Sequence, residues 1–247
     1  MINKDMAKTV AVILAGGSGV RFGSDKPKQF LEIDGRALIE YTIDAFEKHT
    51  LIDEIAIVTR ADYIDWCREI VARNAYTKVS RILPGGKERY HSSLSAIEVY
   101  NDDDRLIFHD AVRPFVSERI ISDCVQALKS YDAVDVAVRT VDTIIQVGED
   151  NCITSIPPRP LLRNGQTPQC FKRSVISKAY ELALQDPDFR TTDDCGVVVR
   201  YLPEVPVYVV EGEYSNMKLT NYEDLAILQK YWELLGYSSG GPGGSEL

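Results

Sequence analysis

Long apolar runs are missing from this sequence of 247 residues. No segment approaches the roughly 20 consecutive apolar residues that a helix needs to cross a bilayer. Residues 1–8 are polar and lack the apolar segment of a secretory signal. We therefore expect a protein that does not interact with membranes.

Cysteines are few and scattered along the chain. The five of them are odd in number and show neither the spacing of a metal site nor a disulfide framework: Cys67, Cys124, Cys152, Cys170 and Cys195. Disulfides persist mainly in oxidising compartments. The pattern predicts a cytoplasmic protein whose cysteines are buried, small apolar groups.

Positive charge is also scarce, with 28 Lys and Arg against 37 Asp and Glu and a formal net charge of −9. This balance argues against a nucleic-acid or anionic-membrane binder, which normally presents a basic face. An acidic protein that handles an anionic substrate must gather its cations in a few places. Arg21, Lys26 and Lys28 lie beside a glycine cluster, and Lys87 and Arg89 follow a Gly-Gly pair.

Five short apolar runs alternate with segments of helical spacing. The runs are residues 10–14, 55–58, 79–83, 105–108 and 134–138, and the helical segments are 37–47, 61–73, 88–100 and 117–131. This alternation is typical of βαβ units, and the 45% hydrophobic content suffices for a full core. We predict an α/β fold with three layers, a doubly wound and mostly parallel sheet. Right-handed crossovers then bring the loops after the strands to one edge, where ligands bind.

Residues 141–163 break the alternation. A β-type run is followed by a polar turn at 148–151, a second short apolar piece, and then Pro157, Pro158 and Pro160. Because proline is confined to sheet edges and turns, we predict a protruding β-arm through which a homodimer forms. Residues 1–237 are assigned to a single domain, and the Gly-rich residues 238–247 to a flexible tail.

A glycine-rich segment follows the first apolar run and reads LAGGSGVRF at 14–22, followed by KPKQ at 26–29. Glycine lets the backbone approach a ligand closely, and successive N–H groups in such a turn form an anion-binding concavity. Arg21 and Lys28 then stand where they could neutralise phosphate oxygens. The segment is not a dinucleotide fingerprint, because Phe22 replaces the last glycine, and it lacks the Gly-Lys-Ser/Thr ending of a P-loop.

Further motifs follow in order: GGKERYHS at 85–92, HDAVRP at 109–114, VDT at 141–143, QTPQ at 166–169, TDD at 192–194 and NMKLT at 216–220. Together with the two N-terminal motifs they extend from residue 14 to residue 220, and the resemblance that they carry covers about residues 9–235. The set resembles nucleotidyltransferases that activate sugars and polyols, and above all the methylerythritol phosphate and ribitol phosphate cytidylyltransferases. The resemblance implies an enzyme that joins CTP to a polyol phosphate, yields a CDP-polyol and pyrophosphate, and uses Mg²⁺ or another divalent cation.

The resemblance also implies roles for single residues. It makes Arg21 and Lys28 the catalytic groups that stabilise charge on the α-phosphate. It places CTP at Leu14, Ala15, Gly16, Gly17, Gly19, Gly86, Arg89, Ser92 and Ala111. It places the acceptor at Asp110, Arg113 and Lys218 and, from the partner subunit, at Thr143 and Arg159, with Asp110 also near the metal. Relatives often carry an acidic residue where this chain has Lys87.

Some of these residues also have a structural interpretation. Asp110 could cap the segment after its strand, and Arg113 could be an ion-pair partner. We expect His109 to be packed or hydrogen-bonded. Asp193 and Asp194 resemble metal ligands, but the preceding threonine favours a helix N-terminus, where acidic residues complement the helix dipole.

The acceptor and two rival classes of protein stay open. Residues 133–135, 165–169 and 212–216 look more like the ribitol enzymes, so we favour ribitol 5-phosphate. The TDD motif resembles the methylerythritol enzymes, which makes methylerythritol 4-phosphate the alternative. An NAD(P)-dependent oxidoreductase would share the layered fold but needs the missing fingerprint. A catalytically inactive nucleotide-binding protein is the other rival, and Arg21, Lys28 and Lys218 argue against it.

Overall fold

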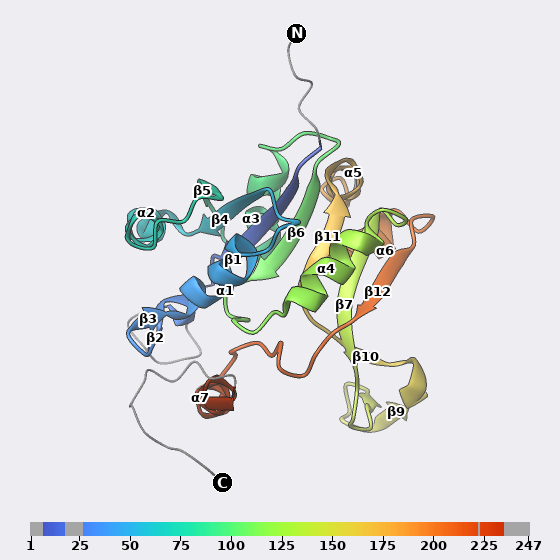
Figure 1. Cartoon of the computed structure of the whole chain (residues 1–247). Coiled ribbons are helices and arrows are strands. Elements are labelled where there is room, and N and C mark those ends of the chain that lie inside the picture. Colours follow the sequence, from blue (N-terminus) through green and yellow to red (C-terminus); the bar gives the residue numbers. More distant parts are fainter. Residues whose placement is uncertain (1–6, 18–26, 222, 235–247) are drawn as a thin grey trace.

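The structure is a computed structural model, and it describes residues 7–17, 27–221 and 223–234 (Figure 1). Its centre is one mixed sheet with the strand order β10-β7-β11-β6-β1-β4-β5. Strands β10 and β11 pair with different parts of one edge of β7, and β12 pairs with the opposite edge of β7. The strands are β1 (Thr9–Ala15), β4 (Glu54–Thr59), β5 (Val79–Pro84), β6 (Arg105–Asp110), β7 (Ala133–Arg139), β10 (Arg163–Gly165), β11 (Gln169–Lys172) and β12 (Val207–Glu211).

All five predicted strands are present, each longer than predicted by one or two residues. In the parallel part, Val10 of β1 lies opposite Glu54 of β4 and Leu106 of β6. The sequence interpretation missed β11, which inserts antiparallel between β6 and β7 and places Gln169 opposite Phe108. The predicted α/β fold with a mostly parallel sheet is confirmed.

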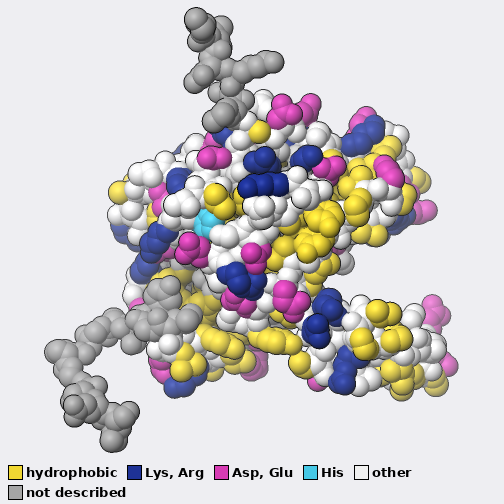
Figure 2. Space-filling view, turned by 45° about the vertical axis from the view of Figure 1, so that its right-hand side comes forward, with side chains coloured by type: hydrophobic (Ala, Val, Ile, Leu, Met, Phe, Trp, Pro, Cys, Tyr) yellow, Lys and Arg dark blue, Asp and Glu magenta, His cyan; other side chains and the backbone are white. Residues whose placement is uncertain are grey.

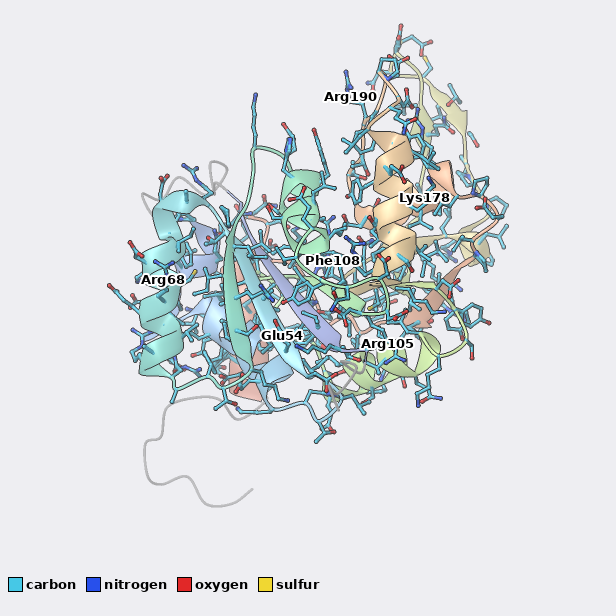
Figure 3. The ribbon with its side chains drawn as sticks, turned by 90° about the horizontal axis from the view of Figure 1, so that it is seen from above. Glu54, Arg68, Arg105, Phe108, Lys178 and Arg190 are labelled. Carbon is cyan, nitrogen blue, oxygen red and sulfur yellow. The ribbon has the colours of Figure 1, made fainter. Side chains whose placement is uncertain are left out.

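Helices cover both faces of this sheet. They are α1 (Leu38–Glu47), α2 (Ile64–Arg73), α3 (Arg89–Ile97), α4 (Glu118–Ala127), α5 (Arg173–Ala183), α6 (Asp194–Tyr201) and α7 (Asp224–Leu234). Alternate residues of β1 point to opposite faces, so Ile13 packs in the core with α1, α2 and α4, and Val12 packs in the core with α3, α5 and α6. Figure 3 shows Phe108 inside these layers, with Arg68 and Lys178 on the outer sides of α2 and α5.

A third, smaller core cluster docks α7 against α1, and we call it the α7 cluster. Trp232 packs edge-on against Tyr41 with a centroid distance of 3.7 Å, and it also contacts Phe115. Leu219, fully buried, belongs to the same cluster. Packing of α7 therefore fixes the segment at 216–220 that precedes it. Short elements before α1 are η2 (Lys28–Phe30), β2 (Glu32–Ile33) and β3 (Arg36–Ala37), and η3 (Ala61–Tyr63) follows β4.

Residues 141–163 form a lobe that projects from the end of β7 (Figure 1). It holds the hairpin of β8 (Gln146–Val147) and β9 (Ile153–Ser155), then η4 (Arg159–Leu161). Figure 2 shows hydrophobic side chains on the surface of the projecting lobe. The exposed large apolar residues of the lobe are Val141, Ile144, Ile145, Val147, Ile153, Ile156 and Leu161. Leu161 is 80% exposed, so this lobe presents an apolar surface to its surroundings.

Four of the five cysteines are buried as predicted, whereas Cys152 is exposed on the lobe, which corrects the prediction for that residue. Burial raises the pKa of the Cys67 thiol to about 12, so this thiol stays protonated and unreactive at neutral pH. Among the described residues, no helix is long and apolar enough to cross a membrane. The predicted tail at 238–247 lies outside the described residues.

Candidate active site

A cavity of about 920 Å³ opens where β1, β4, β5 and β6 end at their carboxyl termini. The described residues that line it are Leu14, Ala15, Gly16, Gly17, Lys28, Gln29, Arg60, Ala61, Asp62, Gly85, Gly86, Lys87, Glu88, Arg89, Ser92, Asp110, Val112 and Lys218. They come mainly from the loops after four neighbouring strands. The predicted gathering of these loops at one sheet edge is confirmed, and the volume suits a ligand of nucleotide size.

The glycine turn after β1 is held in place by Gln29. This buried side chain donates from Nε2 to the carbonyl oxygen of Ala15 at 2.6 Å and to that of Gly17 at 3.1 Å. In a trans peptide the C=O and N–H groups point in opposite directions. The N–H of Gly16 therefore faces away from Gln29, which preorganises one donor of the anion-binding turn.

Ser92 lies between the turns that follow β1 and β5. Its hydroxyl is so close to both that an added Cβ would lie 3.1 Å away at Gly16 and 2.7 Å away at Gly85. Gly85 also donates its N–H to the carbonyl oxygen of Thr59, at the end of β4. Glycine at these two positions lets three parts of the cavity wall pack against each other.

Asp110 ends β6 at the cavity wall and pairs with two cations, of which Lys218 lines the cavity and Arg113 is buried and does not. Its Oδ2 atom lies 3.0 Å from Nζ of Lys218 and 3.2 Å from Nε of Arg113. Burial raises the pKa of Asp110, but the charges of Lys218, Arg89 and Arg113 outweigh it and hold the pKa well below its ordinary value. Asp110 is therefore an anion at any physiological pH, and with Lys218 and Arg113 it forms a group with an excess of positive charge.

The turn that carries Asp110 and Arg113 is braced by His109. Thr167 Oγ1 accepts from the N–H of Asp110 at 3.1 Å and lies 3.0 Å from Nδ1 of His109. Nε2 of His109 lies 3.0 Å from the carbonyl oxygen of Arg113. A carbonyl oxygen only accepts, so Nε2 carries the hydrogen and Nδ1 accepts from the Thr167 hydroxyl.

Burial lowers the pKa of His109 to about 4, so the ring is neutral at physiological pH. The prediction of a packed, hydrogen-bonded His109 is confirmed. Arg113 also donates to the carbonyl oxygen of Asn216 at 2.8 Å. This contact joins the turn after β6 to the segment that carries Lys218.

Lys28 contacts the same segment, residues 216–220, although it lies near the other end of the sequence. Its Nζ atom donates to the carbonyl oxygens of Thr220 at 2.9 Å and Leu219 at 3.3 Å. Because Leu219 belongs to the α7 cluster, the packing of α7 helps to position Lys28. Two lysines distant in sequence, Lys28 and Lys218, therefore line one cavity.

Arg89 is the first residue of α3 and lines the cavity above Gly86. Its guanidinium forms an ion pair with Asp194, with NH1 at 2.5 Å from Oδ2, and it contacts Gln169 Oε1 at 3.4 Å. Asp193 is the N-cap of α6 and accepts from the N–H of Gly196 at 3.1 Å. The favoured interpretation of the acidic pair as a helix N-terminus is confirmed, and Asp194 has the additional Arg89 contact.

The structure brings ten of the predicted site residues to the cavity wall: Leu14, Ala15, Gly16, Gly17, Lys28, Gly86, Arg89, Ser92, Asp110 and Lys218. Gly19 and Arg21 lie outside the described residues. Ala111 does not line the cavity. Its side chain is fully buried in the core, its N–H donates to Leu14, and its carbonyl oxygen accepts from Thr42. Ala111 therefore supports the turn from behind.

Thr143 and Arg159 are exposed on the projecting lobe and do not line the cavity of their own chain. Arg159 donates to the carbonyl oxygen of Val141 at 3.1 Å. Sequence reasoning did not single out Gln29, Arg60 or Gln169. Gln29 and Gln169 lie inside the KPKQ and QTPQ motifs, which was an available signal, whereas Arg60 lies two residues after the predicted strand at 55–58 and belongs to none of the motifs.

The mostly parallel sheet, the glycine turn and the cation-lined cavity together define a nucleotidyltransferase-type α/β protein. A family model described as 2-C-methyl-D-erythritol 4-phosphate cytidylyltransferase (IspD) matches residues 9–233. The chain belongs to this family and is a nucleotidyltransferase of the cytidylyltransferase class.

Individual relatives agree with this family. The 2-C-methyl-D-erythritol 4-phosphate cytidylyltransferase of Thermobifida fusca is 45% identical over 229 residues, which cover 90% of this chain and 92% of the relative. The bifunctional ribulose 5-phosphate reductase/CDP-ribitol pyrophosphorylase Bcs1 of Haemophilus influenzae is 44% identical over 230 residues, covering 92% of this chain but 48% of the relative. The crystal structure of 4-diphosphocytidyl-2C-methyl-D-erythritol synthase from Anaerococcus prevotii superposes with a TM-score of 0.81 at 30% identity, covering 92% and 96% of the two chains.

Proposed function

We propose that this protein transfers the cytidylyl group of CTP to 2-C-methyl-D-erythritol 4-phosphate and releases pyrophosphate. The observation that carries the proposal is the match over 92% of a relative of that name, together with a cavity lined by Lys28, Asp110 and Lys218. Both substrates are polyanions, and this acidic chain gathers cations in that cavity. The comparisons favour this acceptor over ribitol 5-phosphate, which the sequence motifs had favoured.

Ribitol 5-phosphate remains a second candidate acceptor because of one specific observation. The Haemophilus influenzae relative is nearly as similar, at 44% identity, and its name includes CDP-ribitol pyrophosphorylase. The chain covers 48% of that bifunctional relative, whereas it covers 92% of the Thermobifida fusca relative. The family model and the Thermobifida fusca relative both carry the methylerythritol name, which supports that acceptor.

For CTP, we propose that the triphosphate lies at the turn of Gly16 and Gly17, and the cytosine and ribose near Gly86, Arg89 and Ser92. These loops follow β1 and β5, and the end of β4 lies between them in the sheet. A nucleotide that spans both loops must cross the end of β4. Arg60 lines the cavity there and is placed to contact it.

For the acceptor, we propose that Lys218 and Arg113 bind the phosphate group. Their charges exceed that of Asp110, to which both are bonded, by one. The attacking phosphate oxygen is already ionised at neutral pH, so the reaction needs no strong general base. It attacks the α-phosphorus of CTP, the bond to the β-phosphate breaks, and pyrophosphate leaves with the electron pair. Lys28, with Arg21, would stabilise the charge on the α-phosphate oxygens during this step.

A divalent cation fits this arrangement. Among the described residues no cluster of three His, Cys, Asp or Glu side chains could hold a metal alone. Mg²⁺ typically binds one or two carboxylates together with substrate phosphates, and ionised Asp110 is one such carboxylate at the cavity wall. Asp110 would therefore hold the ion together with CTP. When bound, the ion would neutralise phosphate charge.

We further propose a homodimer in which the projecting lobe of each subunit completes the site of the other. The exposed apolar side chains of the lobe support this arrangement, with Leu161 at 80% and Val141 at 63% exposure. In such a dimer Thr143 and Arg159 would contact the acceptor of the partner site. A cytoplasmic location is also proposed, on the basis of the unpaired cysteines.

A competition assay tests the proposed acceptor. The enzyme, CTP, Mg²⁺ and equal concentrations of the two polyol phosphates are mixed, and both CDP-polyols are quantified by mass spectrometry. We expect kcat/KM for methylerythritol 4-phosphate to exceed that for ribitol 5-phosphate by about a hundredfold, which is the order of discrimination that a pocket reaches for one methylene or one added hydroxyl group. A reversed ratio would establish ribitol 5-phosphate instead. UTP in place of CTP is the control for nucleotide selectivity.

A further inference from the structure

The carboxylate of Asp194 is buried completely and holds a residue of the cavity wall. Its Oδ2 atom lies 2.5 Å from NH1 of Arg89, and its Oδ1 atom accepts from the Tyr180 hydroxyl at 2.5 Å. A buried carboxylate needs such partners because burial without them costs several kcal/mol. Arg89 meets this need with one edge of its guanidinium and still lines the cavity.

Gln169 adds a second contact to the same guanidinium. Its side chain is 2% exposed, and Nε2 donates to Asp193 Oδ2 at 2.8 Å and to Asp135 Oδ1 at 3.2 Å. Carboxylates only accept, so they fix the NH₂ end of this amide. The Oε1 end is then turned the other way, where it accepts from the N–H of Asp194 at 3.0 Å and from NH2 of Arg89 at 3.4 Å.

Arg89 is thereby held by two acceptors from β11 and α6, elements that are remote in sequence from α3. A long side chain such as arginine loses much rotamer entropy when it is ordered. If Asp194 and Gln169 already order Arg89 in the free protein, this entropy is not lost when CTP binds. The guanidinium also has five N–H donors, and the two acceptors use one edge of it.

We propose that Asp194 and Gln169 are positioning residues that hold the Arg89 guanidinium at the nucleotide part of the cavity and so set the affinity for CTP. The inference rests on the proposed function, in which Arg89 contacts CTP. It assigns a role to the QTPQ and TDD motifs that neither the acceptor nor the metal explains.

The test is a double-mutant cycle read out as the CTP dissociation constant, measured by calorimetry without acceptor. Asp194→Asn keeps the size and an acceptor for Tyr180 but removes the negative partner of Arg89. We expect CTP affinity to fall about tenfold, as for loss of one charge-assisted bond. In an Arg89→Met background the same Asp194→Asn change should alter CTP affinity less than about twofold, because the residue through which it acts is gone.

A matched control separates positioning from stability. Glu40 is likewise buried, at 1% exposure, and its Oε1 lies 2.5 Å from NH2 of Arg73, and neither residue of this ion pair lines the cavity. Glu40→Gln should lower the melting temperature as Asp194→Asn does but leave CTP affinity unchanged. If folded Asp194→Asn binds CTP as wild type does, or if its effect persists fully in the Arg89→Met background, the inference is wrong.

Tyr180→Phe provides a second route if Asp194→Asn does not fold. It removes the O–H donor to Asp194 and keeps the ring, and we expect CTP affinity to fall about threefold. An unchanged affinity in that variant would also contradict the inference. If wild type itself binds no CTP, the proposed function fails, which is a different outcome from wild type and variants binding CTP equally.

Discussion

Lys218 Nζ lies 3.0 Å from Asp110 Oδ2, and this ion pair joins the end of β6 to the segment before α7. Asp110 is at the carboxyl end of a central strand, whereas Lys218 is held by its neighbour Leu219 in the α7 cluster. The cavity wall is thus completed by residues that lie far along the sequence from β1, β4 and β5, whose following loops line the rest of the cavity. In the proposed function this ion pair sets the acceptor phosphate site.

Replacing Lys218 by alanine should mainly weaken acceptor binding. We expect KM for methylerythritol 4-phosphate to rise by about tenfold to a hundredfold, since a charge-assisted hydrogen bond contributes roughly 1.5–3 kcal/mol. Steady-state kinetics with each substrate varied in turn measures this, and the dissociation constant of CTP should change little. Lys230→Ala, an exposed lysine on α7, is the control. An unchanged acceptor KM would remove Lys218 from the phosphate site.

Replacing Lys28 by alanine should have the opposite signature. Because Lys28 is proposed to act on the α-phosphate during attack, we expect kcat to fall by about 10² to 10³. CTP binding, measured by calorimetry, should change much less. Arg21→Ala should behave in the same way. Lys178→Ala, on the outer side of α5, controls for the loss of a lysine. Near-normal turnover in Lys28→Ala would contradict its catalytic role.

The carboxyl of Asp135 should make stability fall with rising pH. Burial raises its folded-state pKa from 3.8 to about 6. Between about pH 4 and 6 the Asp135 carboxyl is therefore ionised in the unfolded chain but still protonated in the folded protein, which favours unfolding. Above about pH 6 this loss of stability is complete. Asp135→Asn keeps an acceptor for Gln169 and should be more stable than wild type at pH 7.5, by about 1–3 kcal/mol.

Denaturant unfolding of wild type and Asp135→Asn at pH 4.5 and pH 7.5 measures this difference. The gain should shrink toward zero at the lower pH. Asp103→Asn, at an exposed carboxylate, controls for the loss of a surface charge. An Asp135→Asn protein that is less stable than wild type at pH 7.5 would show that the charged form is the favoured one.

The contact between Gly85 and Ser92 predicts a suppressor pair. A Cβ at Gly85 would lie 2.7 Å from the Ser92 hydroxyl. We expect Gly85→Ala to destabilise the fold by about 1–3 kcal/mol through overpacking. Adding Ser92→Ala removes the clashing oxygen and should recover part of this loss in a thermal unfolding assay. If the destabilisations of the two single variants simply add in the double variant, the turn relieves the clash by a movement that does not involve the Ser92 hydroxyl.

A mixed-subunit experiment tests whether sites are shared. Arg159→Ala removes a residue proposed to act on the partner's site, and Lys28→Ala removes one that acts on its own. In a heterodimer of the two, one site has both residues intact, so activity should return to about half that of wild type. Each homodimer should be nearly inactive. Heterodimers purified with two different tags that show no recovery would place Arg159 outside a shared site.

Much of the fold followed from local patterns in the sequence. Short apolar runs such as 10–14 are strands buried on both faces, and their spacing by helical segments predicted the layers. The insertion of β11 could not be predicted, because its four residues have no periodicity and gain their place only by pairing with β6 and β7. Helix α7 was missed as well, since its stability comes from the α7 cluster and not from local pattern.

The cavity residues likewise divide into those that local sequence patterns indicate and those that only the folded arrangement brings together. Glycines and lysines beside predicted strand ends could be recognised, because strand ends of parallel sheets meet at one edge. The partners of Arg89 could not, since Gln169 and Asp194 reach it only through the folded arrangement of β11 and α6. Ala111 shows the converse case, in which a residue inside a motif serves the core and not the ligand.

The preference for ribitol 5-phosphate rested on three segments that turn out to pack together. Gln166 donates to the carbonyl oxygen of Glu213, and Asn216 donates to Gln166 and to the carbonyl oxygen of Thr167. Gln169 donates to Asp135 in the third segment. Since these residues are mutually dependent through packing, their similarity to one group of relatives counts once rather than three times. None of the three segments lines the cavity among the described residues.

The reaction itself can be followed by ³¹P NMR with wild-type protein, CTP, Mg²⁺ and methylerythritol 4-phosphate in one tube. The proposed function predicts that the CTP signals are replaced by diphosphate signals of CDP-methylerythritol and by pyrophosphate in equal amounts, and that Lys28→Ala nearly abolishes this change. If folded wild-type protein leaves CTP intact with this acceptor and with ribitol 5-phosphate, the cation-lined cavity does not transfer a cytidylyl group to either of them.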